Sequence, residues 1–539
     1  MSSFTDRISE RRKTFKNTVD NEDTRRRREE EAVQIRKKEK EEQMARRRKL
    51  VELSSDITGN KVCLDNLPLS AKSVPKFAEY LNSADPMTVA EAAIAIRKIL
   101  SVDRNPPIAE VINAGVLPRL KELLADSNRP NIQLEACWSL TNIASGTPDQ
   151  TQAVVDSGVV PLFVNLLKSI DTSLQEQAVW AVANIAGDRT EYRDGCISVG
   201  TVEAMCQIVG DSLRSGSVQM TRLATWGLSN LCRGKPAPDF SRISIAADVL
   251  AQAICSSNDT EVLSDSAWAF SYLTDSASCE SVNEILSHLN LPRLVSLLAH
   301  PSGSVHTPIL RVIGNLVPGD TLVTQRVVGT PGCLPQLKSL LLSNKKSIRK
   351  EALWTISNIC ADSQAHIQSV IESRLMERIC EILKSGHADA DVKKEAIWCV
   401  CNTVTVGSRF QVDILVKRFD FMTVLCDFIA SSKDTKSLKT ALDAIYTILV
   451  HGQSRTDDSF NAYTELLEEA GGLNTIEDLQ QDQSEEIYQA AVRILENFFN
   501  CEEEEVAPPQ NQNIVFNFTN KPTVSDMREP ANRAHSFSG

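Results

Sequence analysis

The segment AVWAVANIAGD, residues 178–188, decides the fold, because its layout recurs along most of the chain. Each copy places a Trp or Arg four residues before an Asn or Tyr, among small and aliphatic residues. The other copies are ACWSLTNIASG (136–146), ATWGLSNLCRG (224–234), SAWAFSYLTDS (266–276), ILRVIGNLVPG (309–319), ALWTISNICAD (352–362) and AIWCVCNTVTV (396–406). The Trp or Arg residues of consecutive copies are 42 to 46 residues apart. This period predicts stacked helical repeats.

A second phrase recurs between these copies and indicates where helices begin and end. It reads GVLPRLKELL from Gly115, GVVPLFVNLL from Gly158 and GCLPQLKSLL from Gly332, and LPRLVSLL from Leu291 lacks the Gly. Gly suits the end of one helix and Pro the first turn of the next. Each unit therefore reads as a short helix, a turn and two longer helices, which is the armadillo pattern more than the two-helix HEAT pattern.

Composition divides the chain into four segments. We predict a basic arm at 1–59, a linker at 60–73, about ten repeats at 74–500 and an acidic tail at 501–539 that opens with Glu502–Glu505. The outermost repeats serve as caps. The expected fold is all-α, a right-handed superhelical solenoid with a flexible arm and a disordered tail.

Charge is divided between these segments. Residues 1–50 carry 17 Lys or Arg against 11 Asp or Glu, a net of +6, so that with a total of −12 the remaining chain carries −18. A basic arm on an acidic body could bind an acidic partner or its own body.

Several function classes are excluded by what the sequence lacks. No stretch approaches the ~20 apolar residues of a membrane span, and MSSFTDRISERRK has no apolar core typical of a secretory signal. The 14 cysteines are scattered, so we expect reduced, buried side chains in a cytosolic or nuclear protein, with no metal and no cofactor. A P-loop and an HExxH motif are missing, which argues against an enzyme.

Helical geometry assigns the recurring Trp and Asn to one face. With 100° per residue, Asn142 lies about 40° from Trp138, whereas Ala136, Leu140 and Ile143 lie at about 140–200°. If the apolar stripe faces the core, Trp and Asn face outward together. Packing between repeats is the alternative for any single Trp. Recurrence of the pair in five repeats favours a surface ladder instead.

A ladder of this kind suits an extended peptide. Helices pack about 8–10 Å apart, and two residues of extended chain span about 6.6 Å. One Asn amide per repeat could pair with both backbone groups of a peptide, and slots between Trp rings could hold lysine stems. Asp188, just after Asn184, is placed to pair with a lysine head, although it could also be a plain turn residue.

EQAVWAVANIAGD, TWGLSNLCRGKPAP and SDSAWAFSYLTD closely resemble the armadillo repeats of the importin-α family. The resemblance implies a nuclear import adaptor for mono- and bipartite lysine-rich localisation signals. Its major signal-binding site would comprise Trp138, Asn142, Gly146, Thr151, Gln177, Trp180, Asn184, Asp188, Trp226 and Asn230, extended by Trp268 and Tyr272. Its minor site would comprise Arg311, Asn315, Glu351, Trp354, Asn358, Glu395, Trp398 and Asn402.

Four positions bear on how these sites differ. Arg311 replaces Trp in mid-array, as in the family, and its cation would repel lysines and divide the array into two sites. Leu223, Pro318 and Thr403 depart from the family's usual Asn, Thr and apolar or aromatic residue. These departures affect details of peptide preference and not the class.

The basic arm resembles the family's importin-β-binding domain. Its basic clusters are Arg25, Arg26, Arg27 and Arg28, and Arg46, Arg47, Arg48 and Lys49. The resemblance implies binding to importin-β, autoinhibition by the second cluster, recycling by an exportin through the C-terminal repeats, and shuttling between cytoplasm and nucleus. Interspersed Glu and a lack of aromatics argue against direct nucleic-acid binding. An armadillo scaffold of signalling or junctional type, binding other extended peptides, is the alternative.

Overall fold

A computed structural model describes residues 64, 67–102, 105–275, 277–453 and 461–499 of the 539-residue chain. The predicted arm at 1–59, part of the linker at 60–73 and the tail at 501–539 lie outside these residues. Every regular element among the described residues is a helix. The prediction of an all-α fold is therefore confirmed.

The described helices form ten units, of three helical elements each in the first nine units and four in the last. Units 1 to 5 comprise η1 (Ala71–Ser73), α3 (Val74–Leu81) and α4 (Pro86–Leu100); α5 (Ile108–Asn113), α6 (Leu117–Ala125) and α7 (Pro130–Ile143); α8 (Pro148–Asp156), α9 (Val160–Leu166) and α10 (Thr172–Ala186); α11 (Thr190–Ser198), α12 (Thr201–Ser215) and α13 (Val218–Cys232); α14 (Phe240–Ile243), α15 (Ala246–Ser256) and α16 (Thr260–Thr274). Units 6 to 10 comprise α17 (Cys279–His288), α18 (Leu291–Leu297) and α19 (Gly303–Leu316); α20 (Thr321–Val328), α21 (Cys333–Leu340) and α22 (Lys346–Cys360); α23 (Gln364–Glu372), α24 (Leu375–Lys384) and α25 (Ala390–Val406); α26 (Arg409–Phe419), α27 (Phe421–Ser431) and α28 (Thr435–Gly452); α29 (Ala462–Glu469), α30 (Gly472–Asp478), η2 (Leu479–Gln481) and α31 (Glu485–Phe498).

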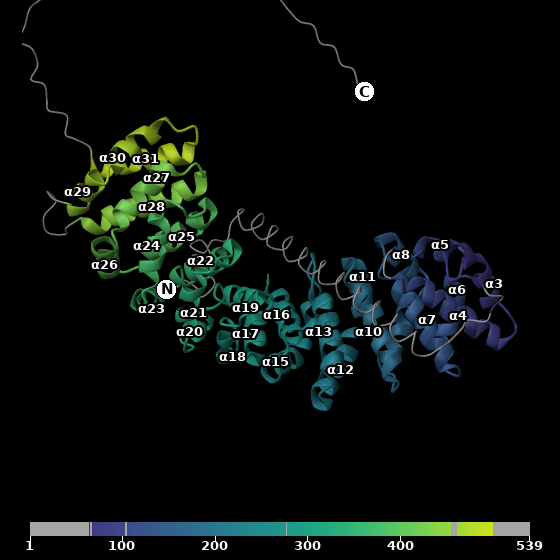
Figure 1. Ribbon diagram of the computed structural model, residues 1–539. Helices are drawn as coiled ribbons and strands as arrows, with labels where there is room; N and C mark the ends of the chain where they lie inside the picture. The colour runs from purple at the N-terminus through teal and green to yellow at the C-terminus, as the bar shows by residue number, and fades with distance from the viewer. Residues whose placement is uncertain (1–63, 65–66, 103–104, 276, 454–460, 500–539) are drawn as a thin grey trace, which may run out of the picture.

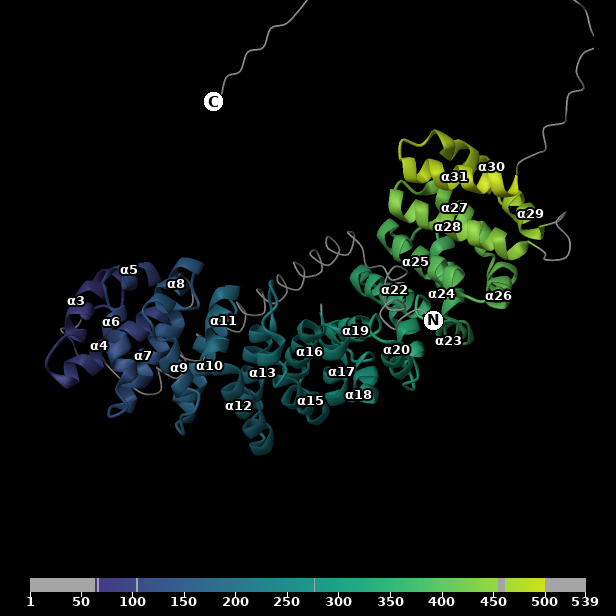
Figure 2. The same cartoon turned by 180° about the vertical axis from the view of Figure 1, so that it is seen from behind.

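The last helix of each unit packs against the last helix of the next, from α4 and α7 at one end to α28 and α31 at the other. Figures 1 and 2 show the result as an elongated, curved array, purple at α3 and yellow at α31. Consecutive repeats are therefore neighbours in space. A residue that recurs once per repeat on these last helices forms a row along the array.

Glycine and proline mark the corners inside the units, as predicted. Gly115, Gly158 and Gly332 have φ of 71°, 73° and 87°, a left-handed conformation that glycine adopts without strain. Pro118 and Pro161 lie in the first turn of α6 and α9. These corners place the second helix of each unit against the last one.

The prediction of one short and two longer helices is confirmed in some units, such as α11 to α13 with 9, 15 and 15 residues, but not in others. In the third unit the middle helix α9 has 7 residues, shorter than the 9 of α8, while α10 has 15. Across the described units the last helix is always at least as long as the others. The surplus length falls on the helices that form the continuous row.

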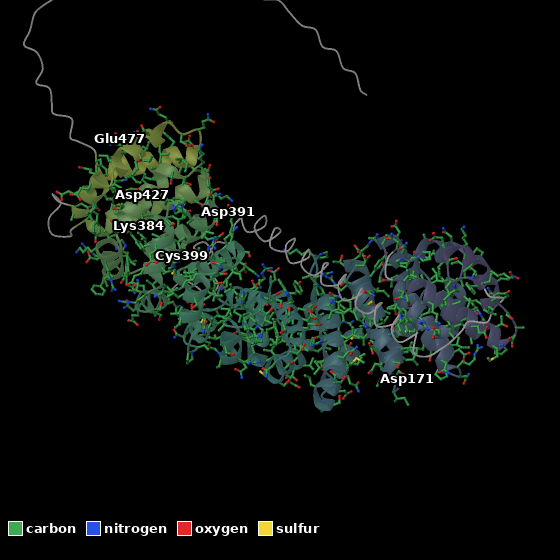
Figure 3. All side chains as sticks on the ribbon, viewed as in Figure 1. Asp171, Lys384, Asp391, Cys399, Asp427 and Glu477 are labelled. Carbon is green, nitrogen blue, oxygen red and sulfur yellow. The ribbon has the colours of Figure 1, made fainter. Side chains whose placement is uncertain are left out.

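Ion pairs join neighbouring repeats along the row. Lys346 Nζ at the start of α22 lies 2.8 Å from Asp391 Oδ2 at the start of α25, and Lys384 Nζ lies 2.8 Å from Asp420 Oδ2. Figure 3 labels Asp391 and Lys384 among the side chains of this region. Such exposed pairs each contribute little on their own, so the array depends chiefly on its apolar core. Among the described helices none is long and apolar enough to cross a membrane.

Candidate peptide-binding ladder

The predicted peptide-binding residues lie on seven consecutive last helices, α7, α10, α13, α16, α19, α22 and α25. We call the row formed by Trp138, Trp180, Trp226, Trp268, Arg311, Trp354 and Trp398, with the Asn or Tyr four residues after each, the ladder. Three predicted residues lie just beyond the helices: Gly146 precedes α8, Thr151 lies in α8, and Asp188 follows α10. The periodicity thus brings all of the predicted ladder positions onto adjacent helices.

The apolar stripe opposite the ladder is core, as predicted, but the ladder itself is more buried than predicted. Ala136, Leu140 and Ile143 are fully buried. Asn184 is 0% exposed and Trp226 is 5% exposed, whereas the prediction placed these side chains on an open surface. Among the tryptophans only Trp138 and Trp398 are half-buried. The prediction of outward-facing, exposed ladder residues is therefore wrong for most of the row.

One reason for this burial is that ladder residues touch each other, both between repeats and within one repeat. The ring centroids of Trp180 and Trp226, on the adjacent helices α10 and α13, are 5.1 Å apart with the planes tilted by 53°, and Trp268 and Tyr272, both on α16, stack at 5.9 Å. Rings at such distances are in direct contact. A lysine stem therefore cannot lie between the Trp180 and Trp226 ring centres, as the slot interpretation requires, and has to pack on the ring faces beside them.

Two arginines cover ladder rings. The guanidinium carbon of Arg97 lies 5.0 Å from the Trp138 ring centroid, and that of Arg311 lies 5.5 Å from the Trp268 ring centroid, both within cation–π range. Arg311 Nε also lies 3.4 Å from Glu351 Oε1 on the next repeat. Arg311 therefore links the last residues of the predicted major site to the first carboxylate of the predicted minor site.

The small residue at Gly314 accommodates the ladder ring of the next repeat. A Cβ atom at position 314 would collide with the six-membered ring of Trp354 and with the Thr355 hydroxyl. Gly314 lies three residues after Arg311, on the helix that precedes Trp354. The missing side chain thus permits close packing of α22 on α19 at the centre of the array.

Most ladder asparagines use one amide hydrogen within the protein. Asn230 Nδ2 donates to the Ala183 carbonyl at 3.0 Å, and Asn402 Nδ2 donates to the Ser357 carbonyl at 2.9 Å. In both pairs the acceptor is the residue just before the ladder Asn of the preceding repeat. Asn315 follows the same rule, donating to the Ser271 carbonyl at 3.1 Å. Asn315 Nδ2 also donates to the Thr274 hydroxyl at 3.2 Å. These bonds hold the amides in fixed orientations and involve the amide nitrogen, so that the amide oxygen can accept from another partner.

Asn184 departs from this rule. Its side-chain oxygen and nitrogen are both buried and form no hydrogen bond within the part of the chain described by the structure, and Asn358 Oδ1 likewise has no partner there. Leaving a buried polar group unpaired costs about 1–3 kcal/mol. Asn184 and Asn358 occupy the middle repeats of the two predicted sites, so each site contains polar atoms whose hydrogen-bonding capacity is not used by the fold.

A second row of side chains lies three residues before the ladder position, on nearly the same face. It contains the predicted Gln177, Glu351 and Glu395, all buried, and also Asp265, which is 5% exposed on α16. We did not predict Asp265, although its position three residues before Trp268 is the signal that identifies it. Glu135 occupies the same position before Trp138 and pairs with Arg97 at 2.7 Å.

The remaining predicted residues serve partly as structure. The Thr151 hydroxyl donates to the Ala144 carbonyl at 3.1 Å and closes the corner between α7 and α8. A Cβ at Gly146 would collide with the Gln150 side chain. Asp188 Oδ2 lies 3.7 Å from Arg189 Nε, and its side chain is mostly covered. Asp188 is thus a carboxylate at the helix end beside the ladder.

The three departures occupy different environments. Leu223 lies on α13 in the second row, nearly fully buried. Pro318 follows the end of α19 and is half-buried. Thr403 is buried and donates from its hydroxyl to the Cys399 carbonyl at 2.6 Å, so it belongs to the core of α25. Of the three, only Leu223 lies in one of the two rows.

Known proteins share this organisation. Family models described as "Importin beta binding domain", "Armadillo/beta-catenin-like repeat" and "Atypical Arm repeat" match the chain at 11–94, at 104–145, 147–187 and 324–361, and at 461–513, respectively. A solved structure of an engineered protein, 27% identical, superimposes with a TM-score of 0.69 over 79% of this chain and 98% of that chain. The predicted armadillo array is therefore confirmed.

Curated relatives match over most of their length. Importin subunit alpha-1b of Oryza sativa subsp. japonica is 39% identical over 84% of this chain and 83% of the relative. Importin subunit alpha-3 of Arabidopsis thaliana is 39% identical over 87% of each chain. Similarity over so much of the chain includes the armadillo repeats that carry the ladder. The chain belongs to the importin-α family, whose members are transport adaptors and not enzymes.

Proposed function

We propose that this protein is a nuclear import adaptor whose ladder binds lysine-rich localisation signals in extended form. The observation that carries the proposal is Asn184 at the middle of the predicted major site, where both polar side-chain atoms are buried and have no hydrogen-bond partner among the described residues. A peptide backbone offers one donor and one acceptor per residue, which is what an unpaired amide requires. A bound peptide would thus give the Asn184 amide the hydrogen bonds that the described part of the fold does not supply.

The side chains around Asn184 favour a cationic peptide. Trp180 and Trp226 present aromatic faces, and each cation–π contact contributes roughly 0.5–2 kcal/mol. Asp188 adds a carboxylate just beyond the end of α10, the helix that carries Trp180, four residues after Asn184. Aromatic faces attract the ammonium and the adjacent stem of a lysine, and a carboxylate pairs with its charge. A peptide with several lysines would engage several repeats in series.

Two binding sites follow from the position of Arg311. Its cation lies at the middle of the ladder, over Trp268 and beside Glu351. A lysine at that point would meet a like charge. We infer a major site from Trp138 to Tyr272 and a minor site from Arg311 to Asn402, so that a bipartite signal would pass across Arg311.

The arm would connect this cargo to a carrier. Residues 11–94 match a model of the importin-β-binding domain, and they include the basic clusters Arg25–Arg28 and Arg46–Lys49, which lie outside the described residues. We infer that importin-β binds the arm. The second cluster resembles a localisation signal, so in the absence of the carrier it would compete with cargo for the ladder.

Recycling would involve the other end of the chain. We infer that an exportin binds the C-terminal repeats, α29–α31, with help from the acidic run Glu502–Glu505 outside the described residues. The protein would then shuttle between cytoplasm and nucleus. Neither direct nucleic-acid binding nor membrane insertion forms part of this mechanism.

The proposal is tested by retention on immobilised peptides. Full chain and a chain that begins at Ser70 are passed over a lysine-rich peptide and over its glutamate-substituted counterpart. We expect retention on the lysine-rich peptide alone, more strongly for the shorter chain, and loss of retention as salt rises. Retention on the acidic peptide instead would favour an armadillo scaffold of signalling or junctional type and contradict the import function.

A further inference from the structure

Two repeats differ from the others in the residue that lies four positions after the ladder Asn or Tyr, which in these two is Asp. Asp188 follows Asn184, and Asp362 follows Asn358. The remaining repeats carry no carboxylate there and have Gly146, Gly234, Ser276, Gly319 and Val406. Both carboxylates therefore belong to the middle repeat of a site, one in the major and one in the minor site. Neither the family resemblance nor the ladder pattern assigned Asp362.

The backbone places the two carboxylates alike. Asp188 N–H donates to the Ile185 carbonyl at 3.2 Å, and Asp362 N–H donates to the Ile359 carbonyl at 3.3 Å. The residues before them, Gly187 and Ala361, have φ and ψ of −80° and −7°, and of −77° and −8°. The helix ends of α10 and α22 are thus superimposable at this point. Asp362 leaves its helix in the direction that Asp188 takes.

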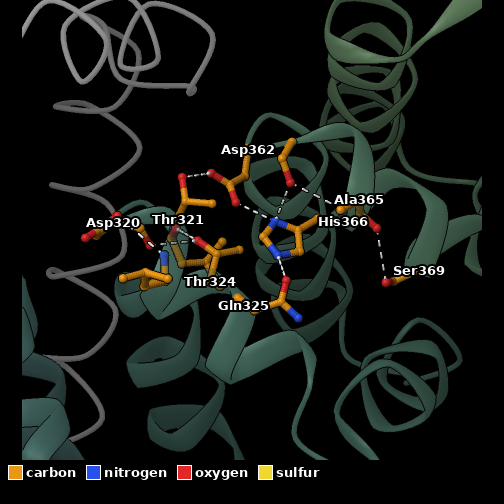
Figure 4. Close-up of polar contacts among 11 residues, drawn as sticks. Asp320, Thr321, Thr324, Gln325, Asp362, Ala365, His366 and Ser369 are labelled. Carbon is orange, nitrogen blue, oxygen red and sulfur yellow. Dashed lines mark hydrogen bonds and ion pairs between the residues drawn. The ribbon is translucent and has the colours of Figure 1, made fainter. Parts of the chain in front are cut away.

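Polar contacts from two helices, α20 and α23, hold Asp362 (Figure 4). The Thr321 hydroxyl of α20 donates to its Oδ1 at 3.2 Å, and His366 Nδ1 of α23 lies in close contact with its Oδ2. His366 is itself fixed, with Nε2 2.9 Å from Gln325 Oε1 and Nδ1 2.9 Å from the Ser363 hydroxyl. The carboxylate is therefore oriented by its surroundings and has no freedom to swing into bulk solvent.

We propose that Asp362 is a lysine-binding carboxylate of the minor site, the counterpart of Asp188 in the major site. This inference rests on the proposed function. A carboxylate has two oxygens with about four acceptor positions, so contacts with Thr321 and His366 are compatible with an additional ammonium. Burial does not count against the role, because the Asp362 side chain and Asn184 are equally covered, at 0% exposed.

The ligand class follows from the charges. Asp362 lies one helical turn beyond Asn358 and on the same repeat as Trp354 and Glu351. A lysine whose stem contacts the Trp354 ring and whose backbone pairs with Asn358 would bring its ammonium toward this helix end. The minor site would therefore require lysine at one defined peptide position, in addition to a general preference for basic sequences. His366 acts as a positioning residue that orients the carboxylate.

The test measures the minor site alone in the full chain. Asp188→Lys is introduced first to suppress the major site, and Asp362→Asn is compared with the unchanged Asp362 in that background. A lysine-rich peptide is titrated by fluorescence anisotropy together with versions in which each lysine in turn is norleucine, which keeps the stem and removes the charge. Asp391→Asn, an exposed carboxylate on the next ladder helix, is the matched control.

We expect Asp362→Asn to lower the affinity for the parent peptide about tenfold, which is the size of one charge-assisted contact. Norleucine at a single position should cost about tenfold when Asp362 is present and nothing in the Asp362→Asn variant, and Asp391→Asn should leave that difference intact. A mere folding defect would weaken every peptide to the same extent. Uniform weakening, or no weakening, would overturn the inference. Failure of the unmodified full chain to bind the lysine-rich peptide would instead overturn the proposed function and this inference with it.

Discussion

Asn230 and Ala183 are joined across two repeats by a hydrogen bond of 3.0 Å from the Asn230 amide to the Ala183 carbonyl. Asn184, the next residue after Ala183, forms no such bond within the described chain. Two asparagines of the same ladder therefore differ in how much of their polar capacity the fold uses. This difference separates a residue's contribution to stability from its contribution to binding.

We predict opposite stability effects for the two alanine substitutions. Asn230→Ala removes a hydrogen bond and should lower the free energy of unfolding by about 0.5–1.5 kcal/mol more than Asn184→Ala does. Asn184→Ala also removes a buried unpaired group, so it should leave stability unchanged or raise it. Both should weaken binding of a lysine-rich peptide. Denaturant unfolding and peptide titration of the same two preparations check this, and a larger loss of stability for Asn184→Ala would be inconsistent with the description of the ladder.

Asp188→Lys should abolish most binding at the major site. The substitution removes the carboxylate just beyond the end of α10 and adds a charge of the same sign as the ligand, at a cost of at least about 2–3 kcal/mol. Calorimetric titration with a peptide containing a single lysine cluster measures the effect. Asp171→Asn, at the opposite end of α10, is the control. If the Asp188→Lys variant binds that peptide as tightly as the parent does, Asp188 is only a turn residue.

The repeat architecture could be predicted because it depends on local features. Trp at a fixed spacing, and Gly and Pro at Gly158 and Pro161, identify helix faces and helix ends without any knowledge of neighbours. Burial of the ladder could not be predicted, because it arises between repeats. A helical wheel places Trp226 opposite the core but contains no information about Trp180 on the adjacent helix, whose ring lies 5.1 Å away.

Two acidic residues lie outside the predicted sites for different reasons. Asp265 lies three residues before Trp268, a position that the family resemblance assigns to the sites only in other repeats. Asp362 is the last residue of ALWTISNICAD, a segment whose likeness to the other copies lies in its Trp and Asn. The internal comparison of helix ends required the backbone conformations of Gly187 and Ala361, which the sequence does not contain.

The Arg222–Asp259 pair should make the free energy of unfolding depend on pH in the acidic range. Asp259 accepts from Arg222 Nε at 2.9 Å and from its Nη2 at 2.5 Å, and it also caps α16. Burial is the largest single influence and opposes ionisation of this carboxyl, but the Arg222 hydrogen bond, the backbone hydrogen bonds from Val262 and Glu261 and the Arg222 charge together outweigh burial and hold its pKa below the ordinary value. A lowered folded pKa means that the stabilisation is present above about pH 4, the unfolded value, and is lost as pH falls through the folded value.

Asp259→Asn tests this dependence, because Asn preserves the cap and removes the charge. We expect the variant to unfold at a lower denaturant concentration than the parent at pH 7. The corresponding loss in the free energy of unfolding should be about 1 kcal/mol. The difference should shrink as pH falls from about 4 toward about 2. Parallel unfolding curves at both pH values, with a constant difference, would show that the ion pair contributes nothing to the junction between α13 and α16.

Removing the acidic tail should weaken binding of the exportin and leave cargo binding unchanged. A chain that ends at Asn500 lacks Glu502–Glu505 but retains every described helix. Pull-down with an exportin and titration with a lysine-rich peptide measure the two activities separately. We expect a loss in the first assay alone. Unchanged exportin binding would mean that the acidic run is only a solvated tail.

The central claim is that one ladder holds lysine-rich segments, whether they come from cargo or from the protein's own arm. About 25 residues separate Lys49 from the first helix of the array, and a flexible tether of that length gives an effective concentration on the order of millimolar. A weak internal site would then be mostly occupied. Carrier binding that withdraws the arm would strengthen cargo binding, and by thermodynamic linkage cargo would strengthen carrier binding by the same factor.

The most direct measurement is the affinity of one lysine-rich peptide for three proteins: the full chain, the chain that begins at Ser70, and the full chain with Arg46→Ala, Arg47→Ala and Arg48→Ala. The account predicts tighter binding by both altered proteins, at least about tenfold above the full chain. Equal affinity for all three proteins would contradict it, because the arm would then not occupy the ladder that the peptide uses.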